Sequence, residues 1–296
     1  MTYQIVTDSG ARFVNAHLLQ EYPIVTVPYA LRIGSRLYRE GQDLSADEVL
    51  QLVQARSSTP QLVAPGVEEY KAVYRRAAQS YEHVISIHTS REMNDSWKNA
   101  RLAAQQMGPS ISVGLIDTRT TCVGQGLLVR MAAELAAQKV PFEEAVQRVR
   151  TAADNIYSLF LVESFERLHH NEILSTAHAT LGELLEIKPL VTMDEGYPVV
   201  TGKVRTRTQA LDRLVEFAEE FDNIQDGVII QARTHITEQT RTLQDRLSVS
   251  FPGKHFPYTI YGASLGSLLG GSVTGIVILE NPLEGEEDDE DKSYYR

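Results

Sequence analysis

A cluster of polar residues follows a short apolar segment in the first half of the chain. The segment VISIH (residues 84–88) has the composition of a β-strand, and Ser90, Arg91, Asn94 and Asp95 come just after it. In an open α/β sheet, ligands bind beyond the carboxyl ends of the strands, and the N-terminus of a following helix attracts anions. These residues could therefore hold an anionic ligand. They could equally cap the next helix, because Ser, Asn and Asp are common N-cap residues.

Two other segments carry residues suited to chemistry. Asp8, in TDSG at the end of the first expected strand, is a candidate carboxylate or a turn cap. The glycine-rich segment GASLGSLLGGSVTG (residues 262–275) offers backbone N–H groups to an anion, or forms a close-packed turn. We interpret His88 as a structural histidine and Cys122, beside a GQG turn, as a small buried hydrophobe. Without a Walker A or HExxH motif, this pattern favours binding over catalysis.

Charge and composition exclude several classes of protein. The 296 residues carry a formal net charge of -11, and the segment 283–296 holds seven acidic residues against Lys292 and Arg296. The remaining acidic balance offers no basic footprint for nucleic acid, and no apolar run is long enough to span a membrane. A single cysteine rules out an intramolecular disulfide and a cysteine-rich metal site, and it fits a cytoplasmic location. We expect neither a cofactor nor a metal ion.

The elements that position these residues alternate between strands and helices. From Tyr3 to about residue 138, apolar strands alternate with amphipathic helices, which predicts a parallel sheet covered on both faces. Beyond about Asp154 the rhythm changes, and the turn Asp194-Glu195-Gly196 predicts an antiparallel hairpin. We therefore expect a two-domain α/β fold, with a parallel α/β/α domain over 1–153, a mixed-sheet α/β domain over 154–282 and a disordered acidic tail over 283–296. Three individual expectations are a strand over 24–33, a strand over 160–168 and a proline-rich connector over 59–65.

The order of several motifs resembles the DegV family. These motifs are IVTDSG (5–10), the connector between Pro60 and Pro65, VISIHTS (84–90), LGELLEIKPLV (181–191) and GKVRTRTQAL (202–211). The resemblance extends over residues 3–280. It implies two α/β domains that hold a long-chain fatty acid in a tunnel between them. It also implies a partner, a fatty acid kinase that phosphorylates the carboxylate of the bound acid.

The resemblance also indicates which residues contact the ligand. They are Leu62, Val63, Ser90, Arg91, Asn94, Ser96, Ser264 and Gly266. Three departures from the family pattern fall at the carboxylate end: Leu62 and Val63 replace a threonine and a serine, and Ser264 replaces a histidine. A basic G-R-I segment that is implied to help dock the kinase becomes Asn171, Glu172 and Ile173.

Arg91 is the residue that we expect to anchor the head group, because a guanidinium binds a carboxylate more strongly than a neutral hydroxyl does. Arg91 could instead form an ordinary surface pair with Glu92, or the head-group site could be adapted to another lipid. A competing hypothesis is an enzyme that transfers phosphate or acyl groups with Asp8 and the segment 264–271. A third is an interaction protein that uses its acidic tail. The sequence favours the non-catalytic lipid-binding hypothesis.

Overall fold

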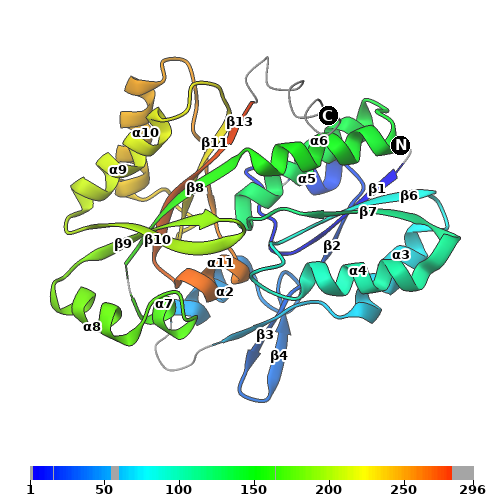
Figure 1. The fold of residues 1–296 in the computed structure, drawn as a ribbon, viewed down its shortest axis with the longest axis horizontal. Helices are drawn as coiled ribbons and strands as arrows, with labels where there is room; N and C mark the ends of the chain where they lie inside the picture. The colour runs from blue at the N-terminus through cyan, green and yellow to red at the C-terminus, as the bar shows by residue number, and fades with distance from the viewer. Residues whose placement is uncertain (1–2, 16, 55–59, 164, 282–296) are drawn as a thin grey trace, which may run out of the picture.

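The first sheet is parallel, as the strand–helix alternation predicts. The computed structural model describes residues 3–15, 17–54, 60–163 and 165–281. Within these residues, four parallel strands in the order β2-β1-β6-β7 form one sheet (Figure 1). Their bounds are β1 (Tyr3–Asp8), β2 (Ile24–Val27), β6 (His83–His88) and β7 (Ser112–Asp117). Because the strands run parallel, their carboxyl ends bring Asp8, His88 and Asp117 to one edge.

Helices cover both faces of this sheet. Val6 and Val84 pack against α3 (Val67–Ala77) and α4 (Ser96–Met107), whereas their neighbours Ile5 and Ile85 pack against α5 (Cys122–Ala137) and α6 (Phe142–Asp154). This alternation follows from the two-residue period of a strand. Figure 1 shows the two pairs of helices above and below the sheet. Short elements complete this part: α1 (Leu18–Glu21), α2 (Ala46–Gln54) and the 3₁₀ helix η1 (Gly108–Ser110).

The second sheet is mixed and has the strand order β10-β9-β8-β13-β11-β12. Among its described strands, only β11 and β12 pair in parallel, and the other neighbours are antiparallel. The bounds are β8 (Ile156–Val162), β9 (Lys188–Asp194), β10 (Tyr197–Val204), β11 (Ile224–Gln231), β12 (Tyr258–Ile260) and β13 (Val273–Glu280). The expected hairpin is confirmed: β9 and β10 are joined at Glu195 and Gly196, both with positive φ, as in a type I′ turn.

Helices α7 to α11 accompany the second sheet. α9 (Arg207–Glu219) and α10 (Glu238–Ser250) pack on one face, through a core that includes Leu159, Leu161 and Ile276. The others are α7 (Glu166–His170), α8 (Thr176–Leu184) and α11 (Ala263–Leu269). Among the described residues, no helix is both long and apolar enough to cross a membrane.

Helix α5 joins the two sheets. It contacts β1 and β6 of the first sheet and β8 and β13 of the second. It is buried almost all round, so it shows an apolar sequence and little amphipathic period. Its apolar side chains belong to one cluster of buried hydrophobic residues, which extends from Ile5 in the first sheet to Val277 in the second. Helix α6 ends at Asp154 and β8 begins at Ile156, but a domain boundary between 153 and 154 stays a prediction. The acidic tail lies outside the described residues.

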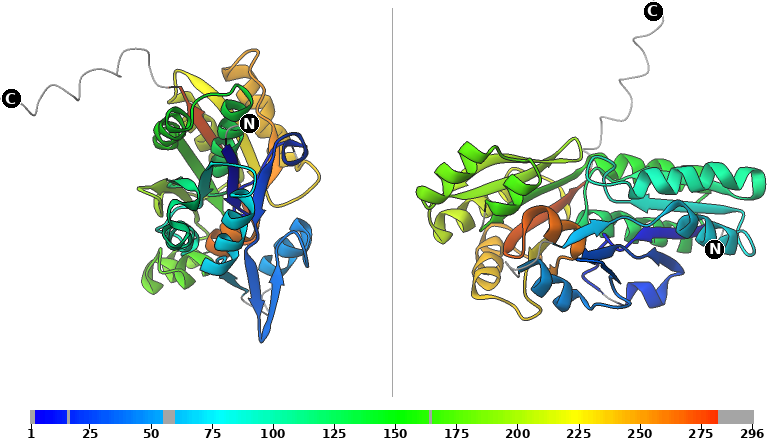
Figure 2. Two further views of the ribbon diagram at one scale, coloured as in Figure 1. Left: turned by 90° about the vertical axis from the view of Figure 1, so that its right-hand side faces the viewer. Right: turned by 90° about the horizontal axis from the view of Figure 1, so that it is seen from below.

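A third, antiparallel sheet is absent from the sequence-based prediction. It has the order β4-β3-β5, with β3 (Ala30–Ile33), β4 (Arg36–Arg39) and β5 (Gln61–Val63), and its β3–β4 hairpin projects from the body (Figure 2). The expectation of one strand over 24–33 is wrong. The run is divided at Pro28, which has no N–H to continue a ladder, and its halves join different sheets. The connector also contains a strand, β5.

Three further expectations are corrected. The run 160–168 is not one strand, because β8 ends at Val162 and α7 begins at Glu166. The first half of the glycine-rich segment is a helix rather than a turn, since α11 occupies Ala263–Leu269. The supposed GQG turn lies inside α5, where a Cβ on Gly126 would come within 1.9 Å of the Arg12 carbonyl oxygen. That glycine therefore permits close approach of two backbone segments.

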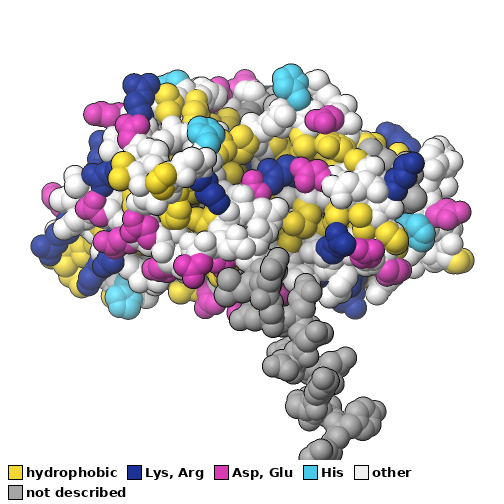
Figure 3. Space-filling view, turned by 90° about the horizontal axis from the view of Figure 1, so that it is seen from above, with side chains coloured by type: hydrophobic (Ala, Val, Ile, Leu, Met, Phe, Trp, Pro, Cys, Tyr) yellow, Lys and Arg dark blue, Asp and Glu magenta, His cyan; other side chains and the backbone are white. Residues whose placement is uncertain are grey.

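The surface seen in Figure 3 mixes charges of both signs. Lys and Arg side chains are interspersed there with Asp and Glu side chains and with apolar ones. The charged groups of this face therefore form no patch of a single sign.

Candidate functional site

A buried carboxylate lies at the carboxyl edge of the first sheet. Asp8 is 0% exposed and accepts hydrogen bonds on both oxygens. Its partners are Gly10 N (3.0 Å), Gln125 Nε2 (2.9 Å) and Thr89 Oγ1 (3.1 Å) on Oδ1, and Ser96 Oγ (2.6 Å), His88 Nδ1 (3.1 Å) and Thr89 N (3.2 Å) on Oδ2. Burial alone raises the pKa of Asp8. Hydrogen bonds from His88, Ser96 and Gln125 and the charge of His88 outweigh burial and hold the pKa below its usual value.

Asp8, His88 and Ser86 are connected in the order of a catalytic triad. His88 Nε2 lies 2.7 Å from Ser86 Oγ, on the side of the ring opposite Asp8. All three side chains are completely buried, however, and Ser86 Oγ lies 2.8 Å from the hydroxyl of Tyr74. A nucleophile must reach its substrate, and none of the three lines a described cavity. This geometry supports the structural interpretation of His88.

A chain of hydroxyl groups extends from this network to a cavity. Thr89 Oγ1 lies 3.5 Å from Thr121 Oγ1, at the outer limit of a hydrogen bond. Thr121 Oγ1 lies 2.9 Å from Ser264 Oγ in the first turn of α11. Ser264 lines the cavity, so the buried network fixes the position of a hydroxyl at its wall.

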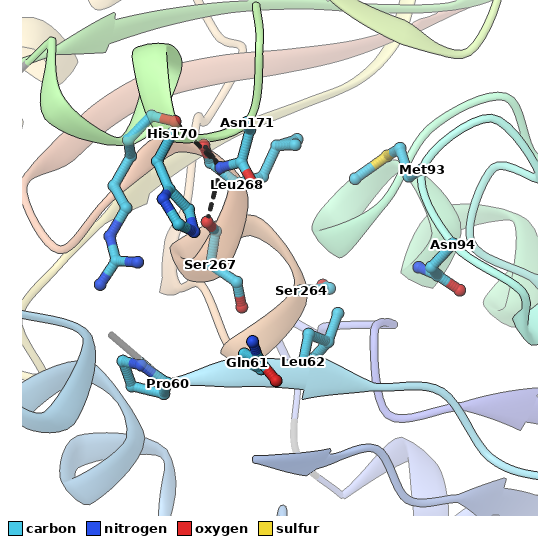
Figure 4. A pocket seen from close by; sticks show the side chains of 11 residues that line it. Pro60, Gln61, Leu62, Met93, Asn94, His170, Asn171, Ser264, Ser267 and Leu268 are labelled. Carbon is cyan, nitrogen blue, oxygen red and sulfur yellow. Dashed lines mark hydrogen bonds between the residues drawn. The ribbon is translucent and has the colours of Figure 1, made fainter. Parts of the chain in front are cut away.

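The cavity lies where β5, the loop after β6, α7 and α11 meet. It has a volume of about 350 Å³, within the range of small-molecule sites. Its wall is formed by Pro60, Gln61, Leu62, Met93, Asn94, Arg167, His170, Asn171, Ser264, Ser267 and Leu268. Figure 4 shows Met93 and Asn94 on one side, His170 and Asn171 on the other, and Leu62 and Ser264 between them.

Asn94 presents an amide donor to this cavity. Its Oδ1 accepts hydrogen bonds from Ser96 N (2.9 Å) and from the hydroxyl of Tyr29 (3.0 Å). Burial and the charge of Asp8 raise the pKa of Tyr29, so its hydroxyl keeps its proton and donates. Because the Ser96 N–H can only donate, Oδ1 must face it, and Nδ2 faces the cavity (Figure 4). Nδ2 is buried and has no hydrogen-bond partner among the described residues.

Three of the predicted contact residues, Leu62, Asn94 and Ser264, meet at this cavity. Ser96 and Ser90 are fully buried and do not line it. The Ser96 hydroxyl is used by Asp8. Ser90 Oγ accepts a hydrogen bond from Glu92 N and is covered by the β9–β10 turn, where a Cβ on Gly196 would lie 2.4 Å from that oxygen.

Val63, Gly266 and Arg91 also lie outside the cavity. Gly266 faces α2, where an added Cβ would touch Val53 at 3.5 Å. The Arg91 side chain is 54% exposed, and its Nε lies 3.2 Å from Glu92 Oε1 and 3.4 Å from Asp117 Oδ2. This position gives no support to the expected contact of Arg91 with the head group, because neighbouring carboxylates hold the side chain at the surface.

Sequence reasoning missed the contribution of α7. Asn171, which we expected at a kinase-docking segment, donates from Nδ2 to the carbonyl oxygens of Arg167 (3.0 Å), Ser267 (3.0 Å) and Leu268 (2.9 Å). It thereby connects the end of α7 to α11 (Figure 4). Ser264, Ser267 and Leu268 have the i, i+3, i+4 spacing of one helix face. This spacing could have shown that they line the cavity together, if the segment had been identified as a helix.

Comparison with known proteins gives a consistent result. The model of the DegV family, described as "Uncharacterised protein, DegV family", matches residues 2–281. Protein DegV of Bacillus subtilis is 28% identical over 280 residues, which cover 93% of this chain and 98% of that protein. A DegV domain-containing protein of Deinococcus radiodurans is 34% identical over 224 residues, 75% of this chain and 78% of that protein.

Solved structures show the same fold. A crystal structure described as DegV, a fatty acid binding protein from Bacillus subtilis, has a TM-score of 0.82 and 26% identity, covering 95% of this chain and 100% of that one. A fatty acid binding DegV family protein from Streptococcus agalactiae has a TM-score of 0.84 and 24% identity, with the same coverage. The family match over nearly the whole chain, and the parallel and mixed sheets that agree with these structures, lead to one conclusion: the chain belongs to the DegV family.

Proposed function

We propose that this protein binds a long-chain fatty acid whose carboxylate lies against Asn94 and Ser264. The observation that carries the proposal is Asn94, which lines the cavity and whose buried Nδ2 donor has no partner in the described chain. A carboxylate is an acceptor of hydrogen bonds only, so it complements an amide N–H and a hydroxyl. The fatty acid binding stated for the Bacillus subtilis relative supports the same ligand class.

The acyl chain needs an apolar site, and we assign it to a second cavity beneath α8. This cavity, of about 440 Å³, lies between α8 and the β9–β10 hairpin. Its apolar lining residues are Phe165, Leu174, Leu181, Leu185, Ile187, Pro189 and Val200. It shares no lining residue with the first cavity, and the segment from Phe165 to Leu174 contributes to both. Burial of the chain would contribute about 0.8 kcal/mol per methylene.

Lipid analysis of the purified protein tests this function. Native mass spectrometry should show an added mass in the range of a long-chain fatty acid, and organic extraction should release that acid. Protein that is consistently lipid-free and that also fails to bind added oleate would contradict the proposal.

We also propose that the protein is not an enzyme. The arrangement closest to a catalytic one, formed by Asp8, His88 and Ser86, is sealed from every described cavity. The competing enzyme hypothesis needs Asp8 at an open cleft beside α11, and Asp8 instead uses both oxygens inside the protein. The bound acid would be presented to a separate kinase. The resemblance implies a basic residue at the position of Glu172. A kinase adapted to a basic residue there would therefore couple poorly to this protein.

A further inference from the structure

A second arginine, distinct from the one expected from the sequence, lies at the wall of the first cavity. Arg167 of α7 is 8% exposed. Its aliphatic stem packs on the turn after α11, where a Cβ on Gly270 would lie 3.4 Å from Arg167 Cγ. The Asn171 side chain donates hydrogen bonds both to the Arg167 carbonyl oxygen and to two carbonyl oxygens of α11. These bonds fix the backbone that carries the Arg167 side chain.

The guanidinium of Arg167 has little protein compensation for its charge. It offers five N–H donors, and its hydrogen bond within the described chain runs from Nη2 to the carbonyl oxygen of Val53 at 3.4 Å. No carboxylate in the described chain forms an ion pair with it, whereas Arg12 pairs with Glu40 and Arg130 pairs with Asp226. Residues 55–59, which follow Val53 closely in sequence, contain no Asp or Glu. A buried charge without a counter-charge is costly, so an anion in the cavity would relieve this cost.

The remaining wall carries no negative charge. None of its residues is acidic, and His170, one turn after Arg167, is its other basic residue. Asn94 contributes a partner-free N–H from the opposite side, and His170 lies across the cavity from it (Figure 4). Arg167, His170 and Asn94 therefore line a common space whose wall contains no carboxylate of the described chain.

We propose that Arg167 is the counter-ion for the head group of the ligand, so that the cavity selects an ionised amphiphile over a neutral one with the same chain. The proposal rests on the proposed lipid-binding function and adds the chemical class of the head group. Asn94 and Ser264 hydrogen-bond to the head-group oxygen whether or not it is charged. Arg167 distinguishes a charged head group from a neutral one, because charge–charge attraction is weakly screened inside the cavity.

The test compares two ligands that differ only in the head group. The dissociation constants of oleate and oleyl alcohol are measured at about pH 8, well above the pKa of a carboxylic acid, by displacement of a fluorescent fatty acid. Wild type should prefer oleate by about tenfold or more. Arg167→Gln should lose that preference by weakening oleate alone, and Arg167→Lys, which keeps the charge, should retain most of it. Asn94→Ala should weaken both ligands.

Arg91→Gln is the matched control, because it removes an exposed guanidinium outside the cavity, and it should change neither constant. Equal affinity of wild type for the two ligands would overturn the counter-ion role without any mutant. Equal losses of both ligands in Arg167→Gln would overturn it too, since they would show a structural role. Failure of wild type to bind either ligand would instead refute the lipid-binding function itself.

Discussion

Substitution of Asn94 by Asp should abolish most fatty acid binding without unfolding the protein. The introduced carboxylate would keep the two acceptor contacts of Asn94 Oδ1, with Ser96 N at 2.9 Å and the Tyr29 hydroxyl at 3.0 Å. It would replace the Nδ2 donor, which faces the cavity, by a second carboxylate oxygen. The change therefore acts on the ligand rather than on the surrounding hydrogen bonds.

Two terms contribute to the expected loss. The amide donor makes a charge-assisted hydrogen bond to the ligand carboxylate, and its removal costs ~1.5–3 kcal/mol. Two like charges ~4 Å apart, at an effective dielectric constant of ~20, repel by about 4 kcal/mol. Uptake of a proton by the introduced carboxylate would relieve part of the repulsion, so we expect a weakening of at least about a hundredfold near neutral pH, and a smaller one near pH 5.

Titration with oleate, followed by displacement of a fluorescent fatty acid, measures this loss. Asn15→Asp is a matched control: Asn15 Oδ1 also accepts a hydrogen bond from the backbone N–H two residues later, but Asn15 is exposed and outside the first cavity. The control should bind oleate like wild type. If Asn94→Asp also binds oleate within about threefold of wild type, the carboxylate does not lie at Asn94.

Because the pKa of Asp8 is lowered in the folded protein, its contribution to stability is complete above about pH 4 and is lost as the pH falls through the folded-state pKa. Asp8→Asn should therefore lower the unfolding free energy near pH 7 by ~3–5 kcal/mol and flatten its acid dependence in chemical denaturation; an unchanged acid profile would refute this. Gly182→Ala should lower the unfolding free energy by ~1–3 kcal/mol, because a Cβ there would lie 2.3 Å from Phe165 Cζ. Thr180→Ala, an exposed position on the same helix, is the control and should leave the unfolding free energy unchanged. An unchanged unfolding free energy in Gly182→Ala would contradict this packing. Glu172→Arg should increase phosphorylation of bound fatty acid by a kinase from another DegV-containing species, and efficient turnover with wild type would refute the coupling argument.

The parallel sheet and the hairpin were predictable because local signals agree with the final fold. Alternating strand and helix patterns require a parallel sheet, and Glu195-Gly196 supplies the positive φ angles of a tight hairpin turn. The third sheet was missed because the run on both sides of Pro28 has the composition of one continuous strand. The sequence does not show that its two halves join different sheets. Helix α11 was missed because Gly266 and the glycines that flank the helix are typical of turns, although its leucines have helical spacing.

The site was only partly predictable, for a related reason. Asn94 and Ser264 were identified from the order of motifs, and both line the cavity. The choice between Arg91 and Arg167 depends on which side chain finds a carboxylate nearby. Arg91 lies beside Asp117, a residue from the end of the adjacent strand, whereas Arg167 is buried against Val53. Only the tertiary arrangement distinguishes these environments.

A crystal structure of the protein grown with oleate would show where the ligand carboxylate lies. We expect continuous density for an acyl chain, with a carboxylate oxygen about 3 Å from both Asn94 Nδ2 and Ser264 Oγ. An empty cavity at saturating oleate, or a lipid whose carboxylate lies outside the space lined by Asn94, Ser264 and Arg167, would contradict it.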